Sequence, residues 1–379
     1  MRKRTVHVVV LTNLLAPYRI ALLNAMFETV DLTVIQTGHE GNRPPGWAQS
    51  ARESPRFSII SSRSIQMRRR LYRGSRIEDT KYMHMPLNVV PLLRRLNPDV
   101  IVSSELGLRT LSTVIFRGAG AVPIVVWWGG TPDSERNIGM ARRLLRLVIK
   151  RHVDHWFVYG REAKKYVRSL GVPDHRISFA WNCVGGLPKR KAAADDSIHL
   201  KSSSRLALLY VGQLIGRKGV DTLLRAVGEL KDAGCRVSLL IAGSGPEREA
   251  LVALARQMAL EETYFLGEVS YEAVFTLYEQ ADIVVLPSRR EVWGLVVNEA
   301  LASGTPVVAS NRVGAATDMC PPAARFSADS PAELADVVRS VWADVRAGTF
   351  VQCTGFDPRM VGSDMARILK RLAGSHRRA

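Results

Sequence analysis

The feature of this sequence that most constrains its fold is a repeated alternation of short apolar runs with stretches of helical periodicity. Short apolar runs bounded by turn residues are typical of strands buried on both faces, and the helical stretches supply the long connections that parallel strands need. The alternation therefore predicts an α/β protein with parallel sheets. In the first half the predicted strands are residues 6–11, 32–35, 100–103, 124–127 and 156–158, with a helix over residues 18–27.

A second series of apolar runs begins after a polar stretch, and the two series predict two domains. The stretch, residues 188–204, is rich in Lys, Asp and Ser and predicts an interdomain linker. A chain of 379 residues is also longer than one hydrophobic core usually serves. We therefore predict two doubly wound, Rossmann-like domains, residues 1–187 and 205–356, facing each other across a cleft at the carboxyl ends of both sheets. In the second domain the predicted strands are residues 206–211, 237–241, 264–266, 283–286 and 307–309, and the predicted helices are residues 221–230, 247–259, 271–280 and 295–302.

The N-terminal sequence and the cysteines favour a cytoplasmic protein. Residues 1–15 imitate the start of a secretory signal, but polar residues interrupt the apolar run, which fits a buried strand better. No stretch approaches the roughly 18 apolar residues that cross a bilayer, so any membrane association is peripheral, at the inner face of the cell membrane. The four cysteines lie far apart, and neither they nor the histidines have the spacing of metal ligands.

The positive charge is concentrated in the first half of the chain. The net charge is +18; residues 1–186 hold 29 Lys and Arg against 13 Asp and Glu, whereas residues 187–356 hold 18 against 20. One basic cluster alternates with apolar residues at helical spacing, which is typical of a helix lying on an anionic membrane. The same spacing fits a helix whose apolar stripe packs on the core, and both interpretations remain open. The clusters are Arg63, Arg68, Arg69, Arg70, Arg73 and Arg76, and Arg142, Arg143, Arg146, Lys150 and Arg151, the second alternating with Leu144, Leu145, Leu147, Val148 and Ile149.

Two glycine-rich turns follow the first two strands of the second domain. The first runs from Gly212 to Arg217 and Lys218, and brings two cations and backbone N–H groups to the start of a helix, which favours a diphosphate. The second contains Gly243 and Gly245, where the backbone can approach a ligand closely. Tight strand-to-helix turns need glycine for structural reasons as well, so either turn by itself is weak evidence of a ligand.

Two glutamates eight residues apart form the most specific feature. Glu291 lies in a short loop after a predicted strand, and Glu299 lies in the first turns of the next helix, so both can face one pocket. Carboxylates accept hydrogen bonds from sugar and ribose hydroxyls, and the N–H groups near Gly294 and Leu295 can offset phosphate charge. A structural role fits less well, because Glu299 lies within an apolar run, where an unpaired carboxylate is costly.

With these motifs in order, the second half resembles family 4 of the retaining GT-B glycosyltransferases. The match is strong over residues 206–309, and it extends loosely to Gly171-Val172-Pro173 with Asn182 and to Pro17-Tyr18-Arg19. In that family a final helix crosses back to the N-terminal domain, which implies such a helix over residues 357–379. The matching motifs are Val-Gly-Gln-Leu-x-x-Arg-Lys-Gly, Ala-Gly-Ser-Gly-Pro-Glu, Phe-Leu-Gly-Glu-Val, Ala-Asp-Ile-Val-Val-Leu-Pro-Ser and the glutamate pair.

The resemblance implies roles for individual residues. Glu299 would hold the donor ribose, Glu291 would lie near the transferred sugar, and Lys218 with Arg217 would neutralise the diphosphate of a nucleotide sugar. Further residues are implied at the donor, namely Gly212, Gly243, Gly245, Val269, Trp293, Gly294 and Leu295, and on the acceptor side, namely Tyr18, Arg19, Trp128 and Gly129.

Two departures from the family pattern affect these assignments. Gln213 stands where most members have arginine, so one diphosphate contact is missing unless Arg217 supplies it. Residues 127–131, Trp-Trp-Gly-Gly-Thr, stand where many members have a loop that contains histidine. The sugar-facing group of the first domain is therefore not identified by the resemblance.

The implied reaction is retaining transfer of a sugar from a nucleotide-diphosphate sugar to a saccharide or polyprenyl-linked acceptor, in polysaccharide or glycolipid synthesis. Because cationic side chains can stabilise the departing phosphate and no Asp-x-Asp motif is present, we expect neither a metal nor a cofactor. A nucleotide-sugar 2-epimerase of the same fold is an alternative. A nucleic-acid-binding protein fits the charge alone, but the basic clusters lack interleaved aromatic residues, so no nucleic acid is expected.

Overall fold

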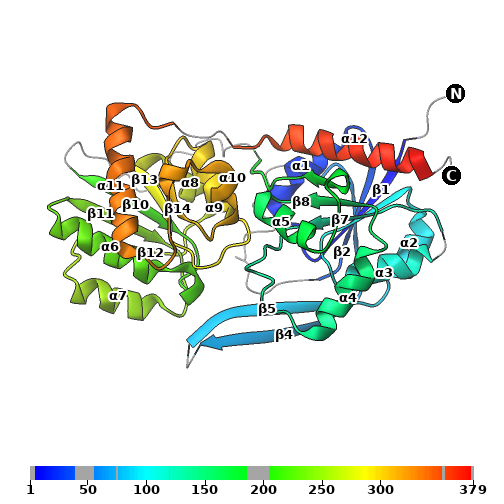
Figure 1. Ribbon diagram of the computed structural model, residues 1–379, viewed down its shortest axis with the longest axis horizontal. Helices are drawn as coiled ribbons and strands as arrows, with labels where there is room; N and C mark the ends of the chain where they lie inside the picture. Colours follow the sequence, from blue (N-terminus) through cyan, green and yellow to red (C-terminus); the bar gives the residue numbers. More distant parts are fainter. Residues whose placement is uncertain are drawn as a thin grey trace. The chain divides into compact units, whose positions relative to one another are not determined.

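The computed structural model describes residues 5–38, 55–73, 76–118, 120–185, 205–351 and 355–376. The predicted linker, residues 188–204, lies outside the described residues. The chain divides into two compact units (Figure 1). The first unit comprises Met1–Arg69, Thr80–Gly185 and Phe356–Ala379, and the second comprises Arg70–Asp79 and Gly186–Gly355.

The first unit contains a seven-stranded parallel sheet in the order β3-β2-β1-β6-β7-β8-β9. The chain adds strands first on one side of β1 and then, from β6, on the other. The carboxyl ends of β1 and β6 therefore form the switch point at which doubly wound sheets bind ligands. The strands are β1 (His7–Thr12), β2 (Asp31–Gln36), β3 (Ser58–Ser61), β6 (Val100–Ser103), β7 (Ile124–Trp128), β8 (His155–Val158) and β9 (Ile177–Phe179).

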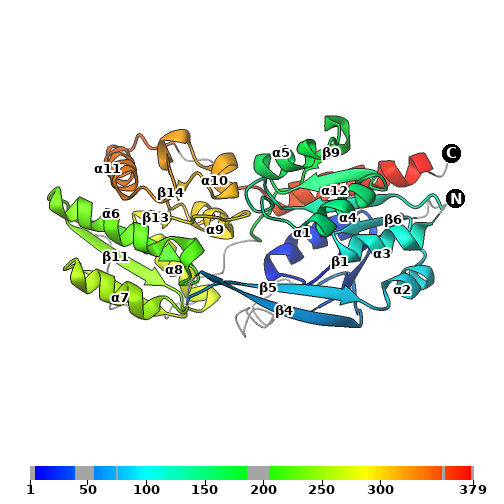
Figure 2. The same ribbon diagram turned by 60° about the horizontal axis from the view of Figure 1, so that its bottom comes forward.

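Helices cover both faces of this sheet (Figure 2). Successive strand side chains point to opposite faces, so Trp127 belongs to one core cluster and Trp128 to another. α1 (Pro17–Phe27) and α12 (Pro358–His376) pack together over the first face. The helices with residues in the clusters of the other face are α2 (Val89–Leu96), α3 (Leu108–Arg117), α4 (Met140–Lys150) and α5 (Arg161–Ser169).

A two-stranded sheet separate from the seven-stranded one was not predicted from the sequence. It consists of β4 (Ser64–Arg73) and β5 (Arg76–Pro86), which form a long ribbon (Figure 2). The ribbon includes most of the first basic cluster. Its strands carry many charged residues and no apolar run, so they lack the pattern that predicts buried strands.

The second unit contains a six-stranded parallel sheet in the order β12-β11-β10-β13-β14-β15. Its switch point lies between β10 and β13, and helices cover both faces, so two doubly wound α/β units are confirmed. The strands are β10 (Leu206–Val211), β11 (Val237–Ala242), β12 (Thr263–Gly267), β13 (Ile283–Leu286), β14 (Val307–Ser310) and β15 (Arg325–Phe326). The helices are α6 (Val220–Asp232), α7 (Arg248–Gln257), α8 (Tyr271–Gln280), α9 (Leu295–Ala302), α10 (Gly314–Met319) and α11 (Pro331–Ala347).

Candidate functional site

Arg217, Lys218 and Glu291 meet at the switch point of the second unit. The two cations lie on a single 3-10 turn, Gly216–Lys218, between β10 and α6, and Glu291 lies in the loop after β13. Arg217 NH1 lies 3.4 Å from Oε2 of Glu291, and Lys218 Nζ donates to the same oxygen. The Glu291 backbone is held in turn, because its N–H donates to the carbonyl of Arg312 at 3.0 Å.

The charges of this group do not cancel, because two cations share one carboxylate. Burial acts to raise the pKa of Glu291, but Lys218 and Arg217 outweigh it and hold that pKa below its ordinary value. Glu291 is therefore ionised at neutral pH, and one net positive charge remains beside the N-terminus of α6. An anion with several oxygens, such as a diphosphate, can compete with Glu291 for these donors.

Glu299 has a different environment. It lies in the second turn of α9 and accepts a hydrogen bond from the Tyr278 hydroxyl at 2.8 Å. Burial raises the pKa of Glu299, and this hydrogen bond offsets only part of the effect. Tyr278 was not predicted from the sequence, since an aromatic residue within an apolar helix pattern gives no sign of a polar contact.

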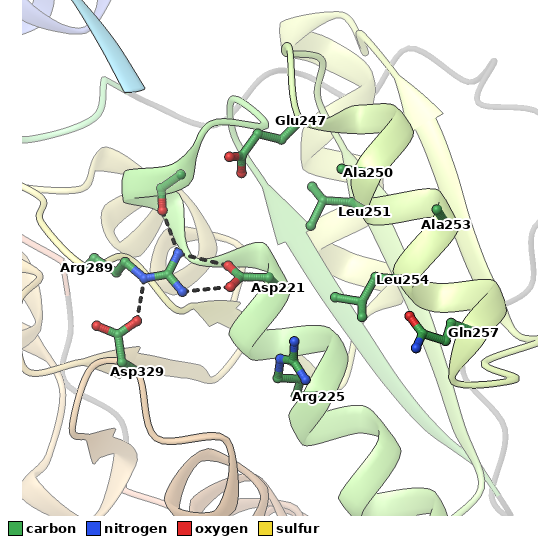
Figure 3. A pocket seen from close by; sticks show the side chains of 11 residues that line it. Asp221, Arg225, Glu247, Ala250, Leu251, Ala253, Leu254, Gln257, Arg289 and Asp329 are labelled. Carbon is green, nitrogen blue, oxygen red and sulfur yellow. Dashed lines mark hydrogen bonds and ion pairs between the residues drawn. The ribbon is translucent and has the colours of Figure 1, made fainter. Parts of the chain in front are cut away.

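Arg289 fixes the turn that carries the cations. Its guanidinium forms a bidentate pair with Asp221 at 2.8 and 2.7 Å, contacts Asp329 and donates to the Gly216 carbonyl at 2.6 Å (Figure 3). Its backbone N–H donates to the Arg217 carbonyl at 2.8 Å. Hydrogen bonds from the guanidinium to Asp221 raise the pKa of Arg289. Sequence reasoning missed this role, because the motif marks Arg289 only as a loop residue.

A cavity of about 870 Å³ borders this ion cluster, but the predicted catalytic residues do not line it. Figure 3 shows the cluster on one side of the cavity and α7, with Ala250, Leu251 and Leu254, on the other. On the side of the cavity formed by the ion cluster, the Arg289 guanidinium is already paired with Asp221 and Asp329. The cavity is thus distinct from the group formed by Lys218 and Glu291.

The glycines after β10 and β11 lie together, where two backbones nearly touch. A Cβ at Gly243 would lie 1.8 Å from the Gly212 carbonyl oxygen, and one at Gly245 would lie 2.3 Å from the Leu214 carbonyl oxygen. Gly243 also has φ +144°, and Gly212 has φ +154°. These glycines are required by chain packing, whatever the ligand, so their donor-binding role stays a prediction.

The remaining predicted donor residues divide into backbone and side-chain positions. Trp293 is buried, and its Nε1 donates to Asn298 at 2.8 Å, so its side chain is used in the core. Gly294, at φ +94°, precedes α9, and Leu295 is the first residue of that helix, where amides lack partners within the helix. Val269 is partly exposed in the loop after β12.

The acceptor-side predictions fall into two pairs in the first unit. Tyr18 and Arg19 lie at the start of α1, and Arg19 NH2 donates to the Tyr159 hydroxyl. Gly129 leaves room for the Tyr159 ring, because a Cβ added at Gly129 would lie only 2.3 Å from that ring. Trp128 is buried on the opposite side of the sheet and packs against Arg146 and Tyr166. The Trp128 side chain is therefore a core group, whereas Gly129 supports the surroundings of Arg19.

The second basic cluster forms α4, which has two different apolar faces. Leu145 and Ile149 pack on the core, and Arg146 is buried in an ion pair with Glu135 at 2.6 Å. Met140, Leu144, Leu147 and Val148 are exposed and lie on one stripe of the helix. One apolar stripe of the helix therefore packs on the core, and contact of the exposed stripe with a membrane stays a prediction.

Neither a membrane-spanning helix nor a metal-binding cluster occurs in the part of the chain that the structure describes. The described cysteines Cys183, Cys235 and Cys320 form no disulfide bond with one another.

Solved structures share this two-unit architecture over nearly the whole chain. The structure of HepE from Anabaena in complex with UDP matches with a TM-score of 0.68 at 13% identity, over 97% of this chain and all of that one. Another match is the lipopolysaccharide outer core galactosyltransferase WaaB, with a TM-score of 0.63 at 14% identity over 98% of this chain and 97% of that one. The fold is the GT-B class of two Rossmann-like domains.

The sequence comparisons concern mainly the second unit. Residues 192–345 match the family described as "Glycosyl transferases group 1", so this part of the chain is a glycosyltransferase group 1 domain. A GDP-mannose-dependent α-(1-6)-phosphatidylinositol dimannoside mannosyltransferase of Mycobacterium tuberculosis is 33% identical over 155 residues, which are 41% of this chain and 40% of the relative. The chain spans between a quarter and two fifths of the length of its curated relatives.

Proposed function

We propose that the protein is a retaining glycosyltransferase of family 4 that transfers a sugar from a nucleotide-diphosphate sugar to a saccharide or lipid-linked acceptor. The observation that carries the proposal is the meeting of Lys218, Arg217 and Glu291 at the switch point of a group 1 domain. The mannosyltransferase relative, named as GDP-mannose-dependent, agrees with an activated sugar as donor.

In the proposed reaction, the bond from the anomeric carbon to the diphosphate breaks, and its electron pair stays on the departing oxygen. Lys218 and Arg217 stabilise the charge that develops there, with the N-terminus of α6 behind them. The acceptor hydroxyl forms the new bond on the same face of the sugar, and its proton passes to a phosphate oxygen. Glu291, released from the cations by the diphosphate, accepts hydrogen bonds from the sugar hydroxyls, and Glu299 accepts them from the ribose.

The test begins with thermal-shift screening of nucleotide sugars to identify the donor, followed by transfer assays. Lys218→Met should reduce kcat by about 100-fold or more, because one cation at the leaving group is lost. Glu291→Gln should nearly abolish transfer while circular dichroism stays unchanged. Lys231→Met is the matched control, because Lys231 is exposed on α6 and its Nζ donates to the Ala259 carbonyl at 2.7 Å.

Four outcomes would contradict the proposal or its details. Full activity in Lys218→Met would show that the Lys218 charge does not stabilise the departing diphosphate. Loss of activity in EDTA would overturn the proposed independence of metals. Formation of an epimer from the donor alone would favour the 2-epimerase, and inversion at the anomeric carbon, measured by NMR, would exclude retention.

We further propose that the protein docks peripherally on an anionic membrane through α4. The exposed apolar stripe can enter the membrane interface; it consists of Met140, Leu144, Leu147 and Val148. The exposed side chains of Arg143 and Arg151 would then contact lipid headgroups. Each such arginine contributes about 1 kcal/mol at an anionic surface. The excess of positive charge in residues 1–186 supports the same orientation toward anionic lipid.

A further inference from the structure

Arg19 is a buried cation without a carboxylate partner among the described residues. Only 9% of its surface is exposed. Its NH1 lies 3.4 Å from the Thr12 hydroxyl, its NH2 donates to the Tyr159 hydroxyl, and its Nε has no hydrogen-bond partner. The guanidinium lies 4.6 Å from the Trp127 ring centroid. Neutral hydroxyls and a ring face offset only part of the cost of burying a charge, so an anionic ligand would complete this site.

Arg19 lies beside the switch point of the first unit, where its guanidinium contacts the end of β1. Thr12 is the last residue of β1, and Ser103 ends the neighbouring β6. Asn13, Ser104 and Glu105, which follow these strands, are partly exposed. The buried guanidinium is therefore next to the accessible carboxyl edge of the sheet rather than in the middle of the core.

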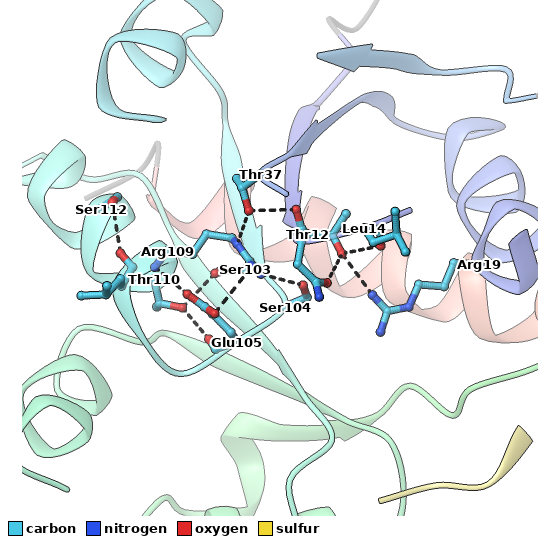
Figure 4. Close-up of polar contacts among 12 residues, drawn as sticks. Thr12, Leu14, Arg19, Thr37, Ser103, Ser104, Glu105, Arg109, Thr110 and Ser112 are labelled. Carbon is cyan, nitrogen blue, oxygen red and sulfur yellow. Dashed lines mark hydrogen bonds and ion pairs between the residues drawn. The ribbon is translucent and has the colours of Figure 1, made fainter. Parts of the chain in front are cut away.

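A second buried arginine is connected to the first through two threonines (Figure 4). Arg109 is 2% exposed, and its Nε donates to the Thr37 hydroxyl at 2.9 Å. Thr37 donates in turn to the Thr12 carbonyl at 3.2 Å, and the Thr12 hydroxyl contacts Arg19. In Figure 4 the two arginines approach Thr12 from opposite sides.

The charges of this cluster leave one cation uncompensated. Glu105 is the carboxylate beside Arg109: its Oε2 lies 3.6 Å from NH2, and its Oε1 accepts the Arg109 backbone N–H at 2.6 Å. Glu105 thus balances Arg109 and precedes α3, while Arg19 remains without a counter-charge in the described chain. Two arginines with one carboxylate produce a net positive charge at the edge of the sheet.

We propose that this edge binds an anionic oxygen group, a phosphate or a carboxylate, of the acceptor. Arg19 supplies the charge, and the planar guanidinium suits both kinds of group, which present two oxygens to its fork. Assigning the anion to the acceptor rests on the proposed function, whereas the anion site itself rests only on the residues of the first unit. The acceptor is then a sugar acid, a sugar phosphate or a lipid-linked sugar diphosphate rather than a neutral sugar.

The test measures anion binding to the full chain without a donor. Because inorganic phosphate can also bind beside Lys218, the titrations use Lys218→Met as the background. Inorganic phosphate and acetate are titrated separately by calorimetry. We expect saturable binding of at least one anion, weakened at least tenfold by Arg19→Met and unchanged by Arg56→Met, which alters an exposed arginine paired with Glu28.

Each outcome decides the proposal independently of the donor site. Phosphate binding alone identifies a phosphate-bearing acceptor, and acetate binding as well admits a sugar acid. No saturable binding of either anion, or equal binding in Arg19→Met, would overturn the proposal even if nucleotide sugars bind normally. If Arg19→Met does not fold, crystals of the wild-type protein soaked in tungstate must show the ion within hydrogen-bond distance of Arg19, and an ion located only elsewhere would refute it.

Discussion

Glu291 and Glu299 belong to one sequence motif, but their neighbours move their pKa values in opposite directions. Glu291 lies against two cations, and its pKa is lowered although burial acts against this. Glu299 is partly buried beside the neutral Tyr278 hydroxyl, and its pKa is raised because its charged form is desolvated there. Glu291 therefore contributes to stability above its unfolded-state pKa and loses that contribution in acid. Charged Glu299 has the opposite effect, because folding must desolvate it without a cation.

We predict that Glu299→Gln changes the pH dependence of stability. In the wild-type protein the folded-state pKa of Glu299 lies above the ordinary value of 4.5, so the folded form holds a proton that the unfolded form releases. The free energy of unfolding then falls as the pH rises from the unfolded-state pKa to the folded-state pKa, by about 1.4 kcal/mol for each pH unit that separates them. Glu299→Gln should lack this fall and be the more stable protein at pH 7, while binding nucleotide sugar more weakly.

Urea unfolding at several pH values between about 4 and 7 measures this difference, and comparison with the wild-type protein removes the contribution of Glu291. The control is Glu229→Gln, because Glu229 is an exposed residue of α6. An equal fall in stability with pH in Glu299→Gln and the wild-type protein would show that Glu299 is not the group responsible.

At the scale of elements, α4 is a helix with one buried and one exposed apolar face. The buried ion pair between Arg146 and Glu135 and the packing of Ile149 hold the helix to the sheet. The exposed stripe therefore contributes little to folding, since its side chains remain in water. An element of this kind can be altered on its outer face without loss of the fold.

We predict that Leu144→Glu combined with Leu147→Glu abolishes flotation with anionic vesicles at low salt. These side chains are 57% and 44% exposed, so the change removes apolar surface from the interface and adds like charge to anionic lipid, with little effect on stability. The control is Ile115→Glu on α3, which is 61% exposed but outside the basic helix. Absence of wild-type flotation, or equal loss in the control, would contradict docking through α4.

At the scale of the whole molecule, the chain leaves the first unit, forms the second and returns. The return is made by α12, whose Val361, Met365, Ala366 and Leu369 join the core cluster that includes α1 and the first sheet. Close approach of the two helices depends on Gly362, because a Cβ there would lie 2.5 Å from the Leu22 carbonyl oxygen. α12 thereby packs into the same core as β1 and α1.

We predict that Gly362→Val destabilises the first unit by roughly 1 to 3 kcal/mol, because the added side chain forces α12 away from α1. The matched control is Gly374→Val on the same helix, where a Cβ meets nothing within 4 Å. Both variants replace a glycine of α12 by valine, so the difference between their unfolding midpoints measures the packing contact. Equal midpoints in thermal unfolding would show that the contact contributes nothing.

Much of the fold and part of the candidate site could be predicted from residue patterns. Strands β6, β10 and β13 begin and end at the predicted residues, because buried parallel strands are apolar throughout and end at turn residues. Lys218 and Glu291 were each predicted as site residues, and the structure brings them together because they follow β10 and β13, which are neighbours in the sheet. The ribbon of β4 and β5 was missed, because its sequence has no apolar run to detect.

The sequence by itself determined where the apolar runs lie, and hence the number, type and order of most elements, because burial of nonpolar side chains follows local periodicity. Only the tertiary structure decided which polar side chains are buried together. Arg19 with Tyr159, Arg289 with Asp221 and Tyr278 with Glu299 are far apart in sequence. Their contacts depend on how the strands are ordered in each sheet, and strand order is set by packing across the whole unit rather than by any local pattern.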